Sequence, residues 1–480
     1  MRAMREKTEK TIFVSAQEME QQHAYTTQLK DILSREERQM YVYIETFGCQ
    51  QNEADSERLL GMACEMGYQP TQDPQQADLL LVNTCAVREH AELKALSITG
   101  QFKHLKAQKP SLLIGVCGCM VSQEHRQSDI KNKYPYVDFL FGTSLLYRFP
   151  QILWETMTKH HRCLYTDEAP HKLAEGLPVH RQSQTQAWVS IMYGCNNFCT
   201  YCVVPYVRGR ERSRNAAQIL SEVEQLVQSG CKEITLLGQN VNSYRGEDCP
   251  DFPTLLHRIC RINGDFTVRF MTSHPKDASA ALIDCMAKEE KIAKQFHLPL
   301  QSGSDAVLQR MNRKYTAASY LALVDALRQK MPDITLSTDI IVGFPGESEE
   351  DFLQTLAVLR AVRFDSVFTF LYSKRHGTPA AEYPDQIPPE VKKERFARLT
   401  ELQNAISLAK NRELIGKTLA VFVQGESKTD PSIYSGRTQG NKLVHFPAAP
   451  ELIGKTVSMQ ITDASFFALF AEVEGSKKSL

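Results

Sequence analysis

The sequence lacks net charge, long apolar stretches and a secretion signal. Its 480 residues carry 56 basic and 56 acidic side chains, so the whole molecule does not attract nucleic acid, and any RNA contact must come from local basic patches. The apolar runs are much shorter than the roughly 20 residues of a membrane helix, so no membrane partner is expected. The charged first residues have no apolar core of a signal peptide behind them. We therefore expect a cytoplasmic protein.

A fourth metal ligand is also missing beside the densest cysteine motif. In a reducing compartment we expect the thirteen cysteines to be metal ligands or packing residues rather than members of disulfides. Cys195, Cys199 and Cys202 are spaced C-x3-C-x2-C, but the next cysteine is Cys231 and no histidine stands between. Structural zinc sites and ordinary four-iron clusters take four protein ligands. A cluster held here would leave one iron free to bind a further molecule.

Three more cysteines follow strand-like segments. Residues 41–119 alternate strands and helices, and the apparent strands end at Cys49, Cys85 and Cys119. This alternation predicts a parallel sheet, and ligands of such sheets collect at the carboxyl ends of the strands. Single buried cysteines are common in protein cores. Three in register favour a second metal site instead.

Cys117 is an alternative third ligand, because a separation of two places it on the same strand face as Cys119. It belongs to the apolar run of the strand, whereas Cys119 follows Gly118 in the loop. We therefore prefer Cys119. Cys64 stands among apolar residues of a helical stretch and is interpreted as a packing residue.

From about residue 187 the pattern predicts a partial (β/α)6 barrel, with fewer units than the eight of a closed barrel. The expected strands are residues 188–192, 233–237, 266–271, 295–300, 335–342 and 366–371. The C-x3-C-x2-C loop follows the first strand, at the end where such barrels place their active sites. Loops after the second, fourth and fifth strands are each typical of tight turns. Together they indicate a nucleotide-sized pocket, with the candidate residues Gln239, Asn240, Ser302, Gly303, Gly343 and Glu347.

The C-terminal part follows a Pro-rich linker at residues 377–389 and a charged helix that begins at residue 391. Short strands at residues 418–423, 442–445, 457–461 and 468–473 predict a small β-barrel. Such a barrel binds either protein or RNA. Arg437 and Lys442, interleaved with aromatic residues, favour RNA.

A second group of basic residues follows the C-x3-C-x2-C loop. Its members are Arg208, Arg210, Arg212 and Arg214. Alternate arginines are typical of a solvated loop, of pairing with nearby carboxylates, or of contacts with RNA phosphates, which suit the guanidinium fork. All three interpretations stay open at the level of the sequence.

The C-x3-C-x2-C loop at the start of a six-fold βα array resembles that of the radical S-adenosylmethionine enzymes. The resemblance implies that Cys195, Cys199 and Cys202 hold a [4Fe–4S] cluster whose free iron binds S-adenosylmethionine. A low-potential electron donor of the flavodoxin or ferredoxin type would reduce it. The six polar and glycine residues of the barrel loops, Gln239 to Glu347, would then contact S-adenosylmethionine.

A narrower resemblance carries the expected activity. Residues 194–214 are similar to the signature of the methylthiotransferases, in which Cys49, Cys85 and Cys119 would hold an auxiliary [4Fe–4S] cluster. Residues 46–57, 83–88 and 272–275 resemble the MiaB branch of that family, with Gln51 where methionine is usual. This implies transfer of a methylthio group to carbon 2 of N6-isopentenyladenosine at position 37 of tRNA. One S-adenosylmethionine would supply the methyl group and another the radical.

Residues 435–446 resemble the TRAM domain, an RNA-binding module. The expected domains are thus an extension with one short helix (1–39), a methylthiotransferase N-terminal domain (40–158), a radical S-adenosylmethionine domain (181–412) and a TRAM domain (413–476). Alternatives are the same chemistry on threonylcarbamoyladenosine or on a ribosomal-protein aspartate. A different class is a non-catalytic iron–sulfur electron carrier or RNA-binding sensor.

Overall fold

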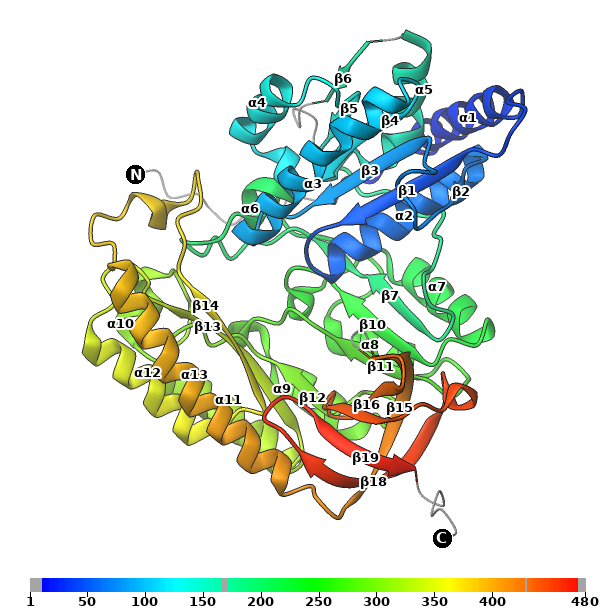
Figure 1. The fold of residues 1–480 in the computed structure, drawn as a ribbon. Coiled ribbons are helices and arrows are strands. Elements are labelled where there is room, and N and C mark those ends of the chain that lie inside the picture. The colour runs from blue at the N-terminus through cyan, green and yellow to red at the C-terminus, as the bar shows by residue number, and fades with distance from the viewer. Residues whose placement is uncertain (1–10, 160, 166–170, 428–429, 474–480) are drawn as a thin grey trace.

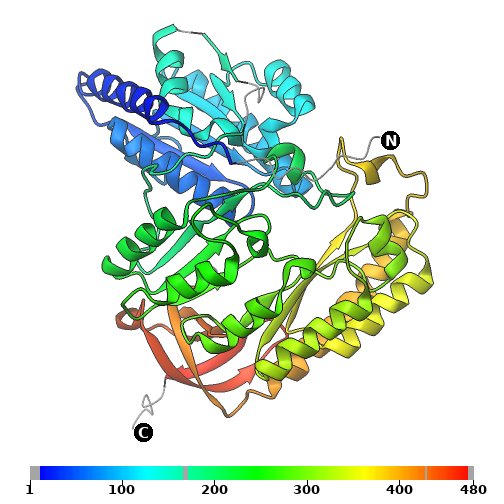
Figure 2. The ribbon, with the colours of Figure 1, turned by 180° about the vertical axis from the view of Figure 1, so that it is seen from behind.

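The computed structural model describes residues 11–159, 161–165, 171–427 and 430–473. They form an N-terminal sheet domain, a central half-barrel and a small C-terminal barrel (Figures 1 and 2). The half-barrel lies between the other two, so that each contacts it. In the described part of the chain, no helix combines the length and the apolar character needed to cross a membrane.

The N-terminal domain is built on a parallel six-stranded sheet in the order β2-β1-β3-β4-β5-β6. The strands are β1 (Tyr41–Thr46), β2 (Gln69–Pro70), β3 (Leu79–Thr84), β4 (Leu113–Gly118), β5 (Phe139–Phe141) and β6 (Cys163–Leu164). The helices between them are α2 (Gln50–Met66), α3 (Glu89–Gln108), α4 (Glu124–Lys133) and α5 (Phe149–Lys159). The predicted parallel sheet is confirmed, and the three predicted strands β1, β3 and β4 are neighbours in it.

The first described helix, α1 (Ala16–Leu33), is longer than the sequence suggests. A capping box between Ser15 and Glu18 starts it. Leu29 and Leu33 are buried in the apolar core of the N-terminal domain, together with residues of α2 and α5. Residues 16–33 are therefore a packed part of this domain.

The central domain is an open barrel of six parallel strands. They are β7 (Gln186–Ser190), β10 (Glu233–Leu237), β11 (Thr267–Phe270), β12 (Gln295–His297), β13 (Thr335–Val342) and β14 (Ser366–Leu371). A parallel bridge between Val268 and Ile292 joins the two three-stranded halves into one curved sheet. The predicted partial barrel is confirmed.

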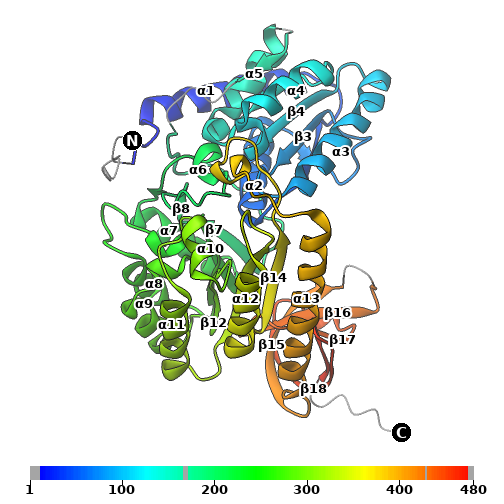
Figure 3. The same ribbon diagram turned by 90° about the vertical axis from the view of Figure 1, so that its left-hand side faces the viewer.

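Amphipathic helices cover the outer face of this sheet and bury its apolar side chains (Figure 3). They are α7 (Ala216–Gln228), α8 (Phe252–Cys260), α9 (Ala280–Lys288), α11 (Ala317–Lys330), α12 (Glu349–Val362) and α13 (Pro389–Arg412). The concave face and the carboxyl ends of the strands are left to the loops.

The C-terminal domain is a closed barrel in the order β15-β16-β17-β19-β18, so the predicted small β-barrel is confirmed. Its strands are β15 (Thr418–Glu426), β16 (Ile433–Thr438), β17 (Leu443–Pro447), β18 (Thr456–Ala464) and β19 (Leu469–Val473). Strand β16 is not among the predicted strands, because Gly436 interrupts its pattern. A Cβ at Gly436 would lie 2.6 Å from the carbonyl oxygen of Phe422, so this glycine lets β15 and β16 approach each other.

Candidate metal centres

Three cysteines meet at one edge of the N-terminal sheet. Cys49 caps α2 directly after β1, Cys85 follows β3, and Cys119 begins the 3-10 turn η1 (Cys119–Ser122) after β4. Because β1, β3 and β4 are adjacent and parallel, their carboxyl ends bring these residues together. Burial, helped by the neighbouring Cys85 and Cys49 and opposed by Arg208, raises the pKa of the Cys119 thiol to about 12.

Gly118 sets the position of Cys119. Its φ of +97° is unfavourable for other residues, and a Cβ there would lie 2.4 Å from the carbonyl oxygen of Thr84. Cys117, on the other side of this glycine, packs in the apolar cluster with Phe139 and Phe141. The fold therefore brings Cys119 to the edge occupied by Cys49 and Cys85, and holds Cys117 in the core.

We expect Gly118→Ala to lower the free energy of unfolding by about 3 kcal/mol, because it adds backbone strain to a steric clash. Gly176→Ala is the matched control, since Gly176 also has a positive φ, of +70°, but no described atom within 4 Å of the added Cβ. That change should cost only about 1 kcal/mol of backbone strain. Urea titration of both variants measures the difference. Equal losses would contradict the close approach at Gly118.

Two asparagines fasten the loops that carry Cys49 and Cys85. The Asn52 amide donates to the carbonyl oxygen of Thr84 at 3.1 Å, and its Oδ1 accepts the backbone N–H of Cys49 at 3.3 Å. The Asn83 amide donates to the carbonyl oxygen of Asn52 at 2.9 Å. Both asparagines are fully buried, so the cross-linked loops keep their spacing.

The C-x3-C-x2-C loop follows β8 (Met192–Tyr193) at the carboxyl end of the half-barrel. Backbone hydrogen bonds join Cys195 to Gly209 at 3.1 Å and Thr200 to Met311 at 3.1 Å. The amide of Asn312 donates to the carbonyl oxygens of residues 197 and 198. The loop is thus held from two sides, and the three cysteines keep one arrangement.

A buried guanidinium lies against one thiol of each cysteine group. Arg208 Nε is 3.1 Å from Cys119 Sγ, and Arg313 Nη1 is 3.4 Å from Cys199 Sγ. Arg208 comes from the loop after α6 (Val204–Val207) and so reaches from the half-barrel into the N-terminal domain. A cation at this distance favours the thiolate form that metal binding needs.

The chemistry of these donors fits iron–sulfur clusters. Burial raises the pKa of Cys195 to about 12, so the thiolate needs a strong positive charge beside it, which bound iron provides. Among the described residues, no three His, Cys, Asp or Glu side chains lie close enough to hold a single metal ion.

Two of the candidate S-adenosylmethionine contacts lie beside the cysteine loop. Gln239 accepts a hydrogen bond from the backbone N–H of Gly194. The Asn240 amide donates to Asp277 at 2.7 Å, while its Oδ1 and the hydroxyl of Ser273 are buried without a partner in the described part of the chain. Such orphaned polar atoms fit a polar ligand at this end of the barrel.

The other four candidates stabilise turns. Gly303 donates its backbone N–H to Thr355 of α12 at 2.9 Å, and Ser302 lies against the same threonine. Glu347 accepts from the backbone N–H of Gly343 at 3.1 Å and pairs with Arg395 at 2.8 Å. Burial raises the pKa of Glu347 to about 7 against these two contacts. These contacts lie within the half-barrel, and the four residues stay predicted contacts of S-adenosylmethionine.

His274, which the sequence analysis noted only within a motif, lies close to this region. Burial, together with the nearby Arg313 and Lys276, lowers its pKa to about 2. Its Nδ1 accepts the backbone N–H of Lys276 at 3.2 Å, so the proton of the neutral ring is on Nε2. His274 is thus a fixed neutral donor.

Two of the four arginines that follow the cysteine loop pair with carboxylates. Arg208 binds Asp55 at 2.8 Å, and Arg214 binds Glu175 and Glu222, each at 2.7 Å. These two arginines are buried. Of the three alternatives given for the arginines, pairing with nearby carboxylates is the one that applies to them.

The remaining basic candidates have different surroundings. Arg212 donates to the carbonyl oxygens of Arg208 and Arg210, and Arg210 lies 5.1 Å from the centre of the Phe198 ring. Lys442 pairs with Asp365 of the half-barrel at 2.9 Å, and the Arg437 guanidinium donates to the carbonyl oxygen of residue 441. Lys442 thus lies in the contact between barrel and half-barrel, and Arg210 is left as the basic candidate beside the cysteine loop.

Gln51, which stands where the MiaB branch usually has methionine, lies in the contact between the N-terminal domain and the half-barrel. Its amide donates to Ser190 of β7 at 2.9 Å and to Asp55 at 3.1 Å. Asp55 in turn binds Arg208. This buried network connects the Cys119 edge with β7, the first strand of the half-barrel, and sequence spacing alone gives no sign of it.

Comparison with known proteins agrees with this architecture. The model of the radical SAM superfamily matches residues 189–359, that of the uncharacterized protein family UPF0004 matches residues 41–142, and that of the TRAM domain matches residues 412–473. A solved radical S-adenosylmethionine methyltransferase, TsrM from Kitasatospora setae, superimposes with a TM-score of 0.52 at 14% identity, covering 72% of this chain and 77% of that one. That likeness concerns the fold alone.

Curated relatives match over nearly the whole length. The tRNA-2-methylthio-N(6)-dimethylallyladenosine synthase of Thermoanaerobacter sp. (strain X514) is 49% identical over 465 residues, which cover 96% of this chain and 98% of the relative. The synthase of Acetivibrio thermocellus is 50% identical over 468 residues, covering 96% and 97%. At this identity and coverage, the chain belongs to the family of tRNA-2-methylthio-N(6)-dimethylallyladenosine synthases.

Proposed function

We propose that the protein is a radical S-adenosylmethionine enzyme that adds a methylthio group to carbon 2 of N6-isopentenyladenosine at position 37 of tRNA. The observation that carries this proposal is the 49% identity to a synthase of that name over 96% of the chain. All three domains take part in the match, which supports the substrate as well as the chemistry.

Cys195, Cys199 and Cys202 would hold the [4Fe–4S] cluster that binds S-adenosylmethionine. The thiols of Cys49, Cys85 and Cys119 would hold the auxiliary cluster. When bound, these groups supply one-electron reduction, a methylated sulfur and a hydrogen-abstracting radical. Carbon 2 requires the radical, because no base removes its hydrogen near neutral pH. The electron donor would be a flavodoxin or ferredoxin.

The protein's own residues would orient these groups and exclude water. Arg208 and Arg313 place a buried positive charge at each thiol group and would lower the energy of the ionised ligands. Asn240 and Ser273 offer buried polar atoms to S-adenosylmethionine. His274 offers the proton on Nε2 as a hydrogen-bond donor without transferring it, because its pKa of about 2 keeps the ring neutral.

RNA contacts would come from the outer faces of the site. Arg210 would bind a phosphate, and Tyr206, 51% exposed beside it, would stack on a base. On the C-terminal barrel, Phe466 and Phe467 are 47% and 60% exposed and suit the same role. A base in the anticodon loop must leave its stack to reach the cysteine loop, as single-stranded RNA readers require.

Nucleoside mass spectrometry of tRNA tests the proposed function. In cells that lack this protein, methylthio-isopentenyladenosine should disappear and isopentenyladenosine should accumulate, while methylthio-threonylcarbamoyladenosine stays unchanged. Cys260→Ala should restore the product and Cys202→Ala should not, since Cys260 is a packing residue of the half-barrel core. Persistence of methylthio-isopentenyladenosine in the deleted strain would reject the substrate.

A further inference from the structure

The last strand of the half-barrel carries large apolar side chains that the protein leaves uncovered. Phe368 and Phe370 of β14 are 49% and 38% exposed. Neighbouring exposed apolar side chains of this size mark a binding surface more often than single ones do. Because β14 is an outer strand of the curved sheet (Figure 1), these rings border the open side of the half-barrel. The proposed reaction so far gives them no role.

Strand alternation shows to which face the two rings belong. Ile340 and Val342 of β13 pack with the helices that cover the outer face of the sheet, so the side chain of Asp339 belongs to the concave face. Phe368 is the register partner of Asp339. Phe370 stands two residues further along β14 and therefore shares this face.

Polar groups stand beside the rings. The ring centres of His297 in β12 and Phe368 are 5.8 Å apart, and His297 Nδ1 is 3.0 Å from the hydroxyl of Ser337. His297 Nε2 is 3.5 Å from a carboxylate oxygen of Asp339, whose side chain stays 26% exposed. A carboxylate has several acceptor positions, so Asp339 can accept a further hydrogen bond from a bound molecule.

This part of the concave face is connected to the C-x3-C-x2-C loop. Directly after β12, the carbonyl oxygen of Pro299 accepts a hydrogen bond from Arg313 at 3.0 Å. The same guanidinium lies 3.4 Å from Cys199 Sγ. One side chain thus joins the strand of His297 to the cysteine loop, and a base held beside that loop lies in the same half-barrel as the exposed rings.

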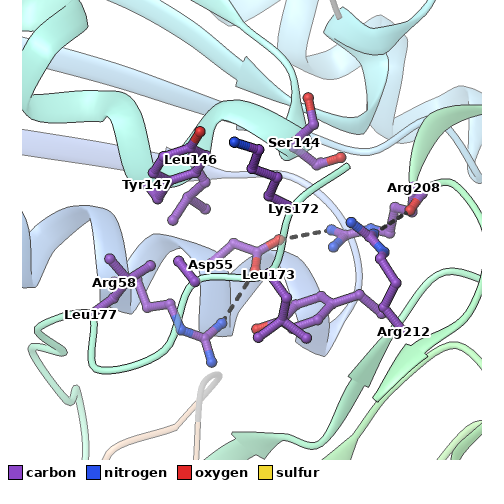
Figure 4. Close-up of a pocket in the computed structure, with 13 residues that line it drawn as sticks. Asp55, Arg58, Ser144, Leu146, Tyr147, Lys172, Leu173, Leu177, Arg208 and Arg212 are labelled. Carbon is purple, nitrogen blue, oxygen red and sulfur yellow. Dashed lines mark hydrogen bonds and ion pairs between the residues drawn. The ribbon is translucent and has the colours of Figure 1, made fainter. Parts of the chain in front are cut away.

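The cavity at the contact with the N-terminal domain is too small for a modified adenosine. Its lining includes Asp55, Arg58, Tyr193 and Arg212 (Figure 4). Its volume is about 50 Å³, whereas pockets for nucleotide-sized molecules are on the order of 300 Å³ or more. The open side of the half-barrel, where the rings of β14 are exposed, has no such limit.

The residue types on this face match the substituent of the proposed substrate. N6-isopentenyladenosine carries an N–H donor directly beside a branched apolar chain. A carboxylate accepts such an N–H, and phenylalanine rings cover apolar carbons. The substituent of threonylcarbamoyladenosine ends in a carboxylate, which the charge of Asp339 would repel. The face therefore favours the apolar substituent over the anionic one.

We propose that Asp339, Phe368 and Phe370 form the face that recognises the N6 substituent of the target adenosine. Asp339 accepts the hydrogen on N6, and the two rings cover the isopentenyl group. His297 is a positioning residue, because it contacts both Asp339 and Phe368. The identity of the substituent rests on the proposed function, whereas the place of the face rests on exposure and register.

Binding of anticodon stem-loops tests the face without turnover. The stem-loops carry adenosine, isopentenyladenosine or threonylcarbamoyladenosine at position 37. Cluster-loaded wild-type protein should bind the isopentenyl form about tenfold more tightly than the adenosine form, the value of roughly one methylene in an apolar pocket. Phe368→Ala should remove most of this preference. Leu353→Ala should keep it and is the matched control, because Leu353 is 46% exposed on α12 of the outer face.

Asp339→Asn tests the carboxylate. The amide oxygen of asparagine still accepts the hydrogen on N6, so the preference for the isopentenyl form over adenosine should remain. Affinity for the threonylcarbamoyl form should rise by about fivefold, because the repulsion between two carboxylates is gone. An unchanged affinity for that form would overturn the role of Asp339.

Two further measurements separate the face from the proposed function. Iron content per chain checks that each variant is folded and loaded, and Phe370→Ala replaces Phe368→Ala if the latter is not. An unchanged preference in the phenylalanine variant, or wild-type protein that methylthiolates the isopentenyl stem-loop without binding it more tightly than adenosine, would overturn the face and leave the function standing. If the wild type shows the preference but forms no methylthio product, the proposed function fails and the face stands.

Discussion

Replacing Cys85 by alanine should halve the iron bound per chain, whereas replacing Cys117 should leave it unchanged. Both thiols lie in the same sheet and each is only 1% exposed, so the two variants lose a similar buried side chain. Only Cys85 lies with Cys49 and Cys119 at the strand ends, while Cys117 packs among phenylalanines. Iron and sulfide assays after anaerobic reconstitution measure the difference.

The same pair separates the two parts of the chemistry. In Cys85→Ala the thiols of Cys195, Cys199 and Cys202 are intact, so reduced protein should still cleave S-adenosylmethionine to 5′-deoxyadenosine. Methylthio formation should fall to background, because the auxiliary group that carries the sulfur is missing. Cys117→Ala should keep both reactions. Equal iron in Cys85→Ala and wild type, or iron loss in Cys117→Ala, would contradict the assigned ligands.

The strands of the fold were predictable where the alternation of apolar and polar residues in the sequence follows the strand over its whole length. Strand β13 alternates buried and half-buried residues over its whole length, and its bounds agree with the predicted residues 335–342. Strand β16 alternates half-buried and buried residues in the same way, but its inward positions include Gly436 and Thr438, so no apolar alternation marks it in the sequence. The last two strands of the N-terminal sheet, β5 and β6, are three and two residues long, too short to show any period.

The candidate site was predictable only where residues stand at the same position of neighbouring parallel strands, because the sheet then brings them to one edge. Parallel strands carry Cys49, Cys85 and Cys119 to one edge, so their placement after strands was informative. Arg208 and Arg313 contact thiols that are 89 and 114 residues away in sequence, and no local pattern indicates such a contact. At Ser302 the residue types do not decide between two roles, because Gly and Ser serve ligand loops and packed turns alike. In the structure Ser302 and Gly303 contact Thr355 of α12.

Arg214→Met should lower the free energy of unfolding by about 3–5 kcal/mol, the usual cost of removing one partner of a buried ion pair. Arg214 is 6% exposed and binds two carboxylates and the carbonyl oxygen of Ser190. Without it, Glu175 loses the ion pair with Arg214, and Glu222 keeps Arg181 at 2.7 Å. Urea titration of the reconstituted protein measures this loss.

Arg210→Met is the matched control, because Arg210 belongs to the same run of arginines but only covers the Phe198 ring. Its removal should cost no more than about 1 kcal/mol of stability, the size of an exposed cation–π contact. It should instead weaken tRNA binding and reduce the salt dependence of the affinity by about one phosphate contact. Arg214→Met should leave the salt dependence unchanged, because its guanidinium is already paired inside the protein. A stable Arg214→Met variant with a reduced salt dependence would reverse the two roles, and would mean that Arg214 leaves its carboxylates to bind RNA.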